Sequence, residues 1–273
     1  MEDTMSKTLL VAALGLLLSV LPANAEERVI CSLAVEIGSP TPLIREGNCD
    51  NQISAASTFK IAISLMGFDA GLFSTPDAPE WPFQEGYADW NPKWKQATTP
   101  RSWMRDSVVW FSQRATEQLG AERFATYVDA FDYGNEDVSG DKGKGNGLTN
   151  AWLSSSLQIS PSEQVGFLSR MIAGALPVSA AAVEQTKALL DSGQRPDGWR
   201  VYGKTGAGIP FDENGALLKG QPFGWYVGWV ENAERQIVFA RLVRFNSRPE
   251  TSPGMIARDG MLKTLFAADG KLN

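Results

Sequence analysis

The chain of 273 residues has a formal net charge of −6, with 43% hydrophobic and 21% charged residues. This composition is typical of a globular protein with a large core in one or two domains, and the lack of a basic block argues against a nucleic-acid-binding surface. The sequence contains no histidine, which excludes every mechanism that depends on an imidazole base.

Residues 1–25 have the pattern of a secretory signal peptide. A largely apolar, uncharged run extends from Leu9 to Leu21, and small residues at Ala23 and Ala25 predict cleavage after Ala25. The run is short for a membrane span, although an uncleaved N-terminal anchor is the alternative. We therefore expect an exported protein without a stable membrane anchor.

Two cysteines, Cys31 and Cys49, flank two short apolar stretches that surround a Gly-Ser-Pro turn. This pattern predicts a hairpin between residues 28 and 48, whose ends would lie close together. An even number of cysteines in an exported chain is compatible with one disulfide. We predict a bond between Cys31 and Cys49, with two free thiols as the alternative.

Helices are expected through the middle of the chain. The stretch STFKIAISLMGFDAGLF (57–73) predicts a buried helix, and residues 99–131 predict two helices separated at Gly120. Between them, residues 73–101 hold five prolines and three tryptophans, and predict irregular chain. We interpret these tryptophans as packing residues, with a substrate rim as the alternative. Ser160, Pro161 and Glu163 form a helix-start signal, and another helix is expected at 180–191.

Strand patterns return after residue 197, at 199–208, 223–231 and 236–245, and an amphipathic helix follows at 254–267. The order predicts an α/β (α+β) fold, in which an antiparallel sheet is flanked by helices and an all-helical domain is inserted. We assign residues 26–56 and 197–273 to the sheet domain and residues 57–196 to the mainly helical domain. The active site is expected at their interface.

Ser57 and Lys60 form the first candidate catalytic pair. Residues at i and i+3 share one face of a helix, so the two side chains can meet. A lysine can act as the base for a serine only when it is neutral, and burial favours the neutral form. The flanking Phe59, Ile61 and Ile63 make such burial plausible. The alternative is an N-cap serine beside a solvated lysine.

Three further motifs could contribute to a site. Lys-Thr-Gly (204–206) at a strand end offers a cation, a hydroxyl and close backbone approach, or is an ordinary turn. Ser-Val-Val (107–109), in a predicted helical stretch, offers a hydroxyl and two stiff apolar side chains, or is simple core. Tyr-Gly-Asn (133–135) is fairly specific, since chance would produce it in roughly a few of every hundred chains of average composition.

Taken together and in this order, the four motifs resemble the pattern of the class D, oxacillinase-type, serine β-lactamases. The likeness covers nearly the whole mature chain and includes NAWLSSSLQIS (150–160) and GWYVGWVE (224–231). Class A enzymes share the first and last motifs but carry Ser-Asp-Asn between them, which this chain lacks. The resemblance implies the fold that serine β-lactamases share with penicillin-binding proteins.

The resemblance also implies catalytic roles. Ser57 matches the acylated serine, and Lys60 matches the lysine that CO2 carboxylates on its amine, giving N6-carboxylysine. Trp152 matches the tryptophan whose indole N–H holds that carbamate, and Ser107 matches the hydroxyl that passes a proton to the lactam nitrogen. The backbone N–H groups of Ser57 and Ala207 match the oxyanion hole.

Substrate-binding residues follow from the same match. Apolar side chains line the site, and the Lys-Thr-Gly motif faces the substrate carboxylate. The implied residues are Val109, Leu153, Lys204, Thr205, Gly206 and Ala207. In one departure, Met255 stands where many class D enzymes have an arginine near the start of the last helix. Arg258, Arg244 or the Thr205 hydroxyl are the candidates to replace that arginine.

The implied function is that of a periplasmic β-lactamase, which hydrolyses penicillins and related antibiotics and confers resistance to them. We expect no metal and no cofactor, apart from the CO2 or bicarbonate that carboxylates the lysine. The expected partner is the small-molecule β-lactam, and no oligomeric state is predicted. Two alternatives stay open: a β-lactam sensor that remains acylated, and a cell-wall transpeptidase.

Overall fold

The computed structural model describes residues 25–212 and 215–272. The segment predicted as a signal peptide therefore lies, except for Ala25, outside the described residues. Within the described ranges, no helix combines the length and the apolar character needed to cross a membrane.

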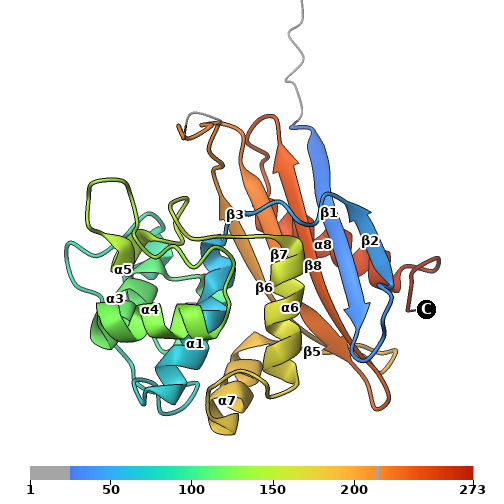
Figure 1. Ribbon diagram of the computed structural model, residues 1–273, viewed down its shortest axis with the longest axis horizontal. Helices are drawn as coiled ribbons and strands as arrows, with labels where there is room; N and C mark the ends of the chain where they lie inside the picture. Colours follow the sequence, from blue (N-terminus) through green and yellow to red (C-terminus); the bar gives the residue numbers. More distant parts are fainter. Residues whose placement is uncertain (1–24, 213–214, 273) are drawn as a thin grey trace, which may run out of the picture.

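The described residues form a six-stranded antiparallel sheet in the order β2-β1-β8-β7-β6-β5. The N-terminal strands thus lie beside the C-terminal ones, as expected from the sequence (Figure 1). The strand bounds are β1 Glu27–Glu36, β2 Ile44–Gly47, β5 Asp191–Gln194, β6 Arg200–Gly208, β7 Phe223–Glu231 and β8 Gln236–Phe245. The predicted fold class is confirmed.

Helices cover both faces of this sheet, which is why β7 is buried along nearly its whole length. On one face, α8 (Pro253–Phe266) packs its Ala257, Met261 and Leu265 side chains into a core with the sheet. On the other face, α6 (Pro161–Ile172) crosses the central strands (Figure 1). A second, larger core joins this face to the remaining helices.

The predicted hairpin and disulfide are both present. Strands β1 and β2 pair antiparallel, with Cys31 opposite Gly47, and Cys31 is bonded to Cys49. Gly47 has a φ of +78°, and a Cβ at this position would lie 2.2 Å from the carbonyl oxygen of Ile30. A glycine is therefore required where the chain leaves β2 toward Cys49.

The other helices gather at one side of the sheet (Figure 1). They are the 3-10 helices η1 Ala56–Phe59 and η2 Pro92–Trp94, and the α-helices α1 Lys60–Asp69, α2 Pro100–Asp106, α3 Val109–Leu119, α4 Ala121–Ala130, α5 Gly147–Asn150 and α7 Ala180–Leu190. Two short strands, β3 (Ile53–Ser54) and β4 (Gln158–Ile159), pair as a separate two-stranded sheet. The start signal of α6 is a capping box, in which Ser160 N donates to Glu163 Oε2 at 2.7 Å.

Three boundaries differ from the sequence prediction by more than one residue. The helix expected at 57–73 consists of η1 and α1 and ends at Asp69. The C-terminal part of the sheet begins at Asp191, upstream of residue 197, because the end of α7 runs directly into β5. Residues 99–131 form three helices instead of two, since Ser107 adopts a left-handed φ of +55° and Val108 is extended. The division of the chain into a sheet domain and a helical domain stays a prediction.

Candidate active site

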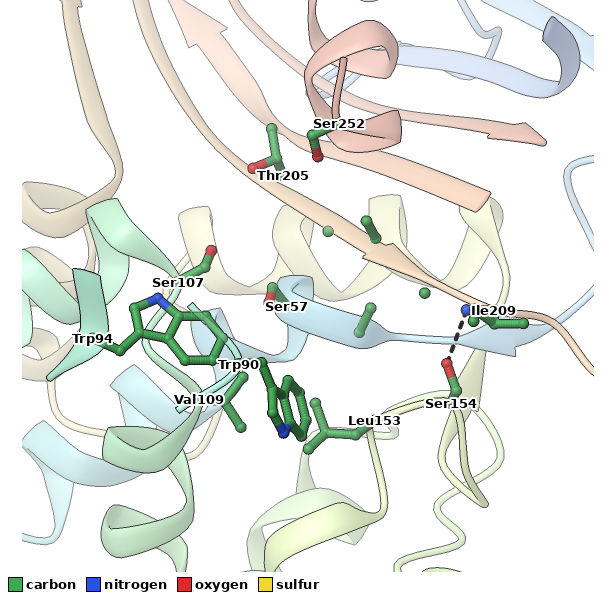
Figure 2. Close-up of a pocket in the computed structure, with 14 residues that line it drawn as sticks. Ser57, Trp90, Trp94, Ser107, Val109, Leu153, Ser154, Thr205, Ile209 and Ser252 are labelled. Atoms are coloured by element: carbon green, nitrogen blue, oxygen red, sulfur yellow. Dashed lines mark hydrogen bonds between the residues drawn. The ribbon is translucent and has the colours of Figure 1, made fainter. Parts of the chain in front are cut away.

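A cleft of about 380 Å³ lies where η1, the α2–α3 junction, the loop after Trp152 and strand β6 meet (Figure 2). Seven of the residues predicted for the site line it: Ser57, Ser107, Val109, Leu153, Thr205, Gly206 and Ala207. The sequence reasoning did not assign seven others that also line it: Ala56, Trp90, Trp94, Ser154, Gly208, Ile209 and Ser252.

Ser57 lies in η1, at the floor of this cleft. The preceding Ala56 has a φ of +49°, a left-handed conformation that is uncommon for a residue other than glycine. Strand β6 runs close to η1, since a Cβ on Gly206 would lie 3.3 Å from the backbone nitrogen of Ser57. Thr58 anchors the turn by donating to the Ala55 carbonyl at 2.6 Å. The strained turn thus holds Ser57 beside the backbone of β6.

Lys60 begins α1 and is completely buried. Its Nζ donates to Ser112 Oγ at 2.8 Å, and no carboxylate of the described residues forms an ion pair with it. Burial, with a smaller contribution from the positive charge of Lys204, holds the pKa of Lys60 well below its usual value. A neutral amine can accept a proton, so Lys60 has the property that a base for Ser57 requires.

Ser112 and Trp103 complete the surroundings of this amine and were missed by the sequence reasoning. The Trp103 indole Nε1 donates to Ser112 Oγ at 2.8 Å, and both side chains are buried. Ser112 comes three residues after Val109, a predicted site residue. The shared helical face of residues at i and i+3 is the signal that could have identified it.

Lys204 and Ser107 are joined across the cleft. Lys204 Nζ donates to Ser107 Oγ at 2.5 Å and to the Thr205 carbonyl oxygen at 3.0 Å. Burial lowers the pKa of Lys204 to about 8, and the negative charge of Asp106 opposes this effect. Because Ser107 accepts from Lys204, its own hydroxyl hydrogen is free to be donated elsewhere.

Trp152 is completely buried, and its ring packs against Phe59 at a centroid distance of 5.4 Å. Ser54 fixes the backbone here, since its Oγ donates to the Trp152 carbonyl at 2.8 Å and accepts from Ser154 N at 3.0 Å. The indole Nε1 has no hydrogen-bond partner within residues 25–212 and 215–272. A buried N–H without an acceptor is costly, so this donor fits a site that receives an anionic group.

The residues of the Tyr-Gly-Asn motif do not line the cleft, and Asn135 forms hydrogen bonds with residues 156 and 158. Asn135 Nδ2 donates to the Ser156 carbonyl, and Gln158 N donates to Asn135 Oδ1, both at 2.9 Å. Gly134 has a φ of +61°, and a Cβ there would lie 2.0 Å from the carbonyl oxygen of Gln158. The motif thus fixes residues 156–158, a few positions after Trp152.

Neither arginine proposed to replace the one expected at Met255 lines the cleft. Arg258 is paired with Asp259 at 2.8 Å, and Arg244 donates to Gln221 at 3.1 Å beside other pockets. The side chains of Thr205 and Ser252 do line the cleft (Figure 2). Both hydroxyls are therefore within reach of a substrate bound in the cleft.

The three tryptophans of residues 73–101 were interpreted as packing residues, with a substrate rim as the alternative, and the structure contains examples of both. Trp81 stacks on Phe111 at 4.4 Å and is a packing residue, as predicted. Trp94 is buried and also lines the cleft, while its Nε1 donates to the Asp106 carbonyl at 3.0 Å. Trp90 is 67% exposed and forms part of the cleft wall, so the rim alternative holds for this residue.

Comparison with known proteins agrees with this geometry. The family model for the penicillin binding protein transpeptidase domain matches residues 23–261. The β-lactamase OXA-9 of Klebsiella pneumoniae is 41% identical over 270 residues, which are 96% of this chain and 97% of that protein. The β-lactamase OXA-1 of Escherichia coli is 42% identical over 189 residues, 68% of this chain and 64% of that protein.

Solved structures give the same result. The crystal structure of the class D β-lactamase OXA-427 superimposes with a TM-score of 0.82 and 45% sequence identity. The superposition covers 86% of this chain and 96% of the OXA-427 chain.

Proposed function

The chain belongs to the class D serine β-lactamases, and from this premise we propose the roles of its residues in opening the lactam ring. As a member of this family it hydrolyses the β-lactam amide, and hydrolysis inactivates the antibiotic and so gives resistance. The geometry of the cleft supports the role that we propose for each residue.

In the acylation step, Ser57 loses its hydroxyl proton to Lys60 and attacks the lactam carbonyl carbon. The backbone N–H groups of Ser57 and Ala207 donate to the oxygen on which negative charge develops. As the carbon–nitrogen bond breaks, Ser107 passes its proton to the lactam nitrogen. The proton that Lys60 took from Ser57 then restores the Ser107 hydroxyl, so that Lys60 is again free to act as a base. The position of Ser107 supports this role, since it lines the cleft and already accepts a hydrogen bond from Lys204.

In the deacylation step, Lys60 accepts a proton from the water that attacks the acyl carbon, and it returns this proton to the Ser57 oxygen as the ester bond breaks. N-carboxylation of the lysine by CO2 would supply an anionic base at the end of this side chain. The surroundings fit that modification, because the reaction requires a neutral amine and the buried Trp152 N–H offers a donor without a partner. The apolar side chains of Val109 and Leu153 keep the site dry.

Recognition of the substrate carboxylate is assigned to Lys204 and to the Thr205 and Ser252 hydroxyls. Lys204 is 4% exposed and supplies the positive charge, while the two hydroxyls line the same end of the cleft. This set takes the place of the arginine that the family often carries where this chain has Met255. We further propose that the protein acts in the periplasm, on the basis of the signal-peptide pattern in residues 1–25.

One observation carries the proposal: a fully buried lysine amine without an anionic partner in the described residues, three positions after the cleft serine, in a chain without histidine. Burst and steady-state kinetics with a chromogenic cephalosporin test it, with and without added bicarbonate. We expect repeated turnover that bicarbonate increases. Stoichiometric acylation of Ser57 without turnover would instead identify a β-lactam sensor.

The pH dependence of substrate capture provides a test of Lys204. Its pKa of about 8 means that the ammonium form, which attracts the substrate carboxylate, is lost as the pH rises through this value. We therefore expect kcat/KM to fall above about pH 8, mainly through a rise in KM, since kcat/KM reports the free enzyme. In Lys204→Arg the side chain stays charged, and this decline should disappear from the profile. An unchanged decline in that variant would assign it to another group.

A further inference from the structure

A buried hydroxyl outside the family motifs lies against the Lys60 amine. Ser112 is completely buried on α3, and its Oγ accepts from Lys60 Nζ and from Trp103 Nε1, each at 2.8 Å. An indole N–H can only donate, so its hydrogen bond fixes the Ser112 oxygen and turns the hydroxyl hydrogen away from Trp103. The hydrogen is then available to the head group of Lys60.

The hydrogen-bond inventory of this hydroxyl is incomplete while Lys60 is an ammonium. A serine hydroxyl has one donor and two acceptor sites, and the two observed bonds use both acceptor sites. Among the residues that the structure describes, no carbonyl or carboxylate accepts the Ser112 hydrogen. An acceptor at the end of Lys60 completes the set, either as the lone pair of the neutral amine or as an oxygen of its carboxylated form.

We propose that Ser112 is a positioning residue for Lys60: oriented by Trp103, its hydroxyl stabilises the N-carboxylated form of the lysine. The inference rests on the proposed function, because it takes carboxylated Lys60 as the base. Ser112 on α3 and Trp152 in the loop before β4 would then be two hydrogen-bond donors supplied by separate elements of the fold. Hydrogen bonds to charged groups are about twice as strong as neutral ones, so each donor should affect the CO2 affinity.

A purely structural role for Ser112 predicts something different. In that case the hydroxyl only satisfies the Trp103 N–H, and its loss would lower stability without changing the chemistry of Lys60. Ser64 offers a matched control, since it is completely buried on α1 one turn after Lys60. Its Oγ bonds to Thr186 Oγ1 at 2.9 Å and not to Lys60. Ser64→Ala therefore removes a comparable buried hydroxyl and leaves the contacts of the lysine intact.

The test measures carboxylation directly, without substrate. Wild type, Ser112→Ala, Trp103→Phe and Ser64→Ala are titrated with ¹³C-labelled bicarbonate, and the carbamate signal is followed by ¹³C NMR. Ser112→Ala removes one charge-assisted hydrogen bond. We therefore expect that half-saturation of this variant needs at least about tenfold more bicarbonate than the wild type. Trp103→Phe keeps an aromatic ring but frees the Ser112 hydroxyl, so it should shift in the same direction. Ser64→Ala should titrate like the wild type.

Thermal unfolding verifies that each variant is folded before its titration is interpreted. A folded Ser112→Ala protein that titrates like the wild type would overturn the inference while leaving the proposed base untouched. If Ser112→Ala does not fold, a wild-type titration in Trp103→Phe overturns it in the same way. A wild-type protein without any carbamate signal at saturating bicarbonate would be a different result, because it removes carboxylated Lys60 from the proposed function itself.

Discussion

Lys60→Ala is expected to fold and to lose turnover by about a thousandfold or more, while an acyl-enzyme on Ser57 accumulates. The chain has no histidine, and no other lysine lies within hydrogen-bond distance of Ser112 or the η1 turn in the described residues. With the base removed, attack by Ser57 is slowed, and water cannot be activated to release the product. Intact-protein mass spectrometry after mixing with a penicillin would detect the persistent adduct.

The stability of Lys60→Ala should differ little from that of the wild type, because Lys60 is completely buried. The mutation removes a buried amine whose charged form is strongly disfavoured, and this offsets the loss of its packed methylene groups. Ser57→Ala is the matched control, since it keeps the base but cannot form the adduct. Lys60→Ala with wild-type turnover would exclude Lys60 as the base, whatever its carboxylation state.

The local elements of this protein follow well from its sequence. The capping box at Ser160 and Glu163, the strand pattern after residue 197 and the hairpin between Cys31 and Cys49 depend on neighbouring residues. Ser57 and Lys60 were predictable for the same reason, because their spacing alone sets a shared direction. The burial of the lysine also followed, since the apolar residues that flank it in the sequence predicted it.

The residues that were missed, and the conformation of Ser107, depend on contacts that no local pattern contains. Ser107 adopts a left-handed conformation in the middle of a helical pattern, and this break both presents its hydroxyl and starts α3 one turn before Ser112. Ser112 contacts Lys60 from 52 positions along the chain. Trp90 and Trp94 have similar sequence surroundings, yet only tertiary packing decides that Trp90 is exposed at the cleft.

The role of Tyr-Gly-Asn shows a second limit of sequence reasoning. The motif is specific enough to support the family resemblance, but its composition does not say whether it contacts substrate. In the structure Gly134 and Asn135 hold residues 156–158, and so act on the loop that carries Trp152. A motif can therefore mark a family without lining the cleft itself.

Trp152→Phe is expected to make activity strongly dependent on added bicarbonate. The change keeps an aromatic ring in the core but removes the buried indole N–H, which has no partner among the described residues. If that N–H holds carboxylated Lys60, its loss should weaken CO2 affinity by about tenfold to a hundredfold. Steady-state rates should then be low in CO2-depleted buffer and recover as bicarbonate is added.

A matched tryptophan in β7 separates this effect from damage to the core. Trp229 is also completely buried, but its Nε1 donates to Glu231 at 3.2 Å and its ring stacks on Tyr202 within the sheet. Trp229→Phe should therefore cost stability without creating a bicarbonate requirement. The Trp152 indole makes no such bond. Trp152→Phe should therefore be less destabilised than Trp229→Phe by the loss of a hydrogen bond, but should lose more activity. Bicarbonate-independent activity in a folded Trp152→Phe protein would show that this indole does not hold the modified lysine.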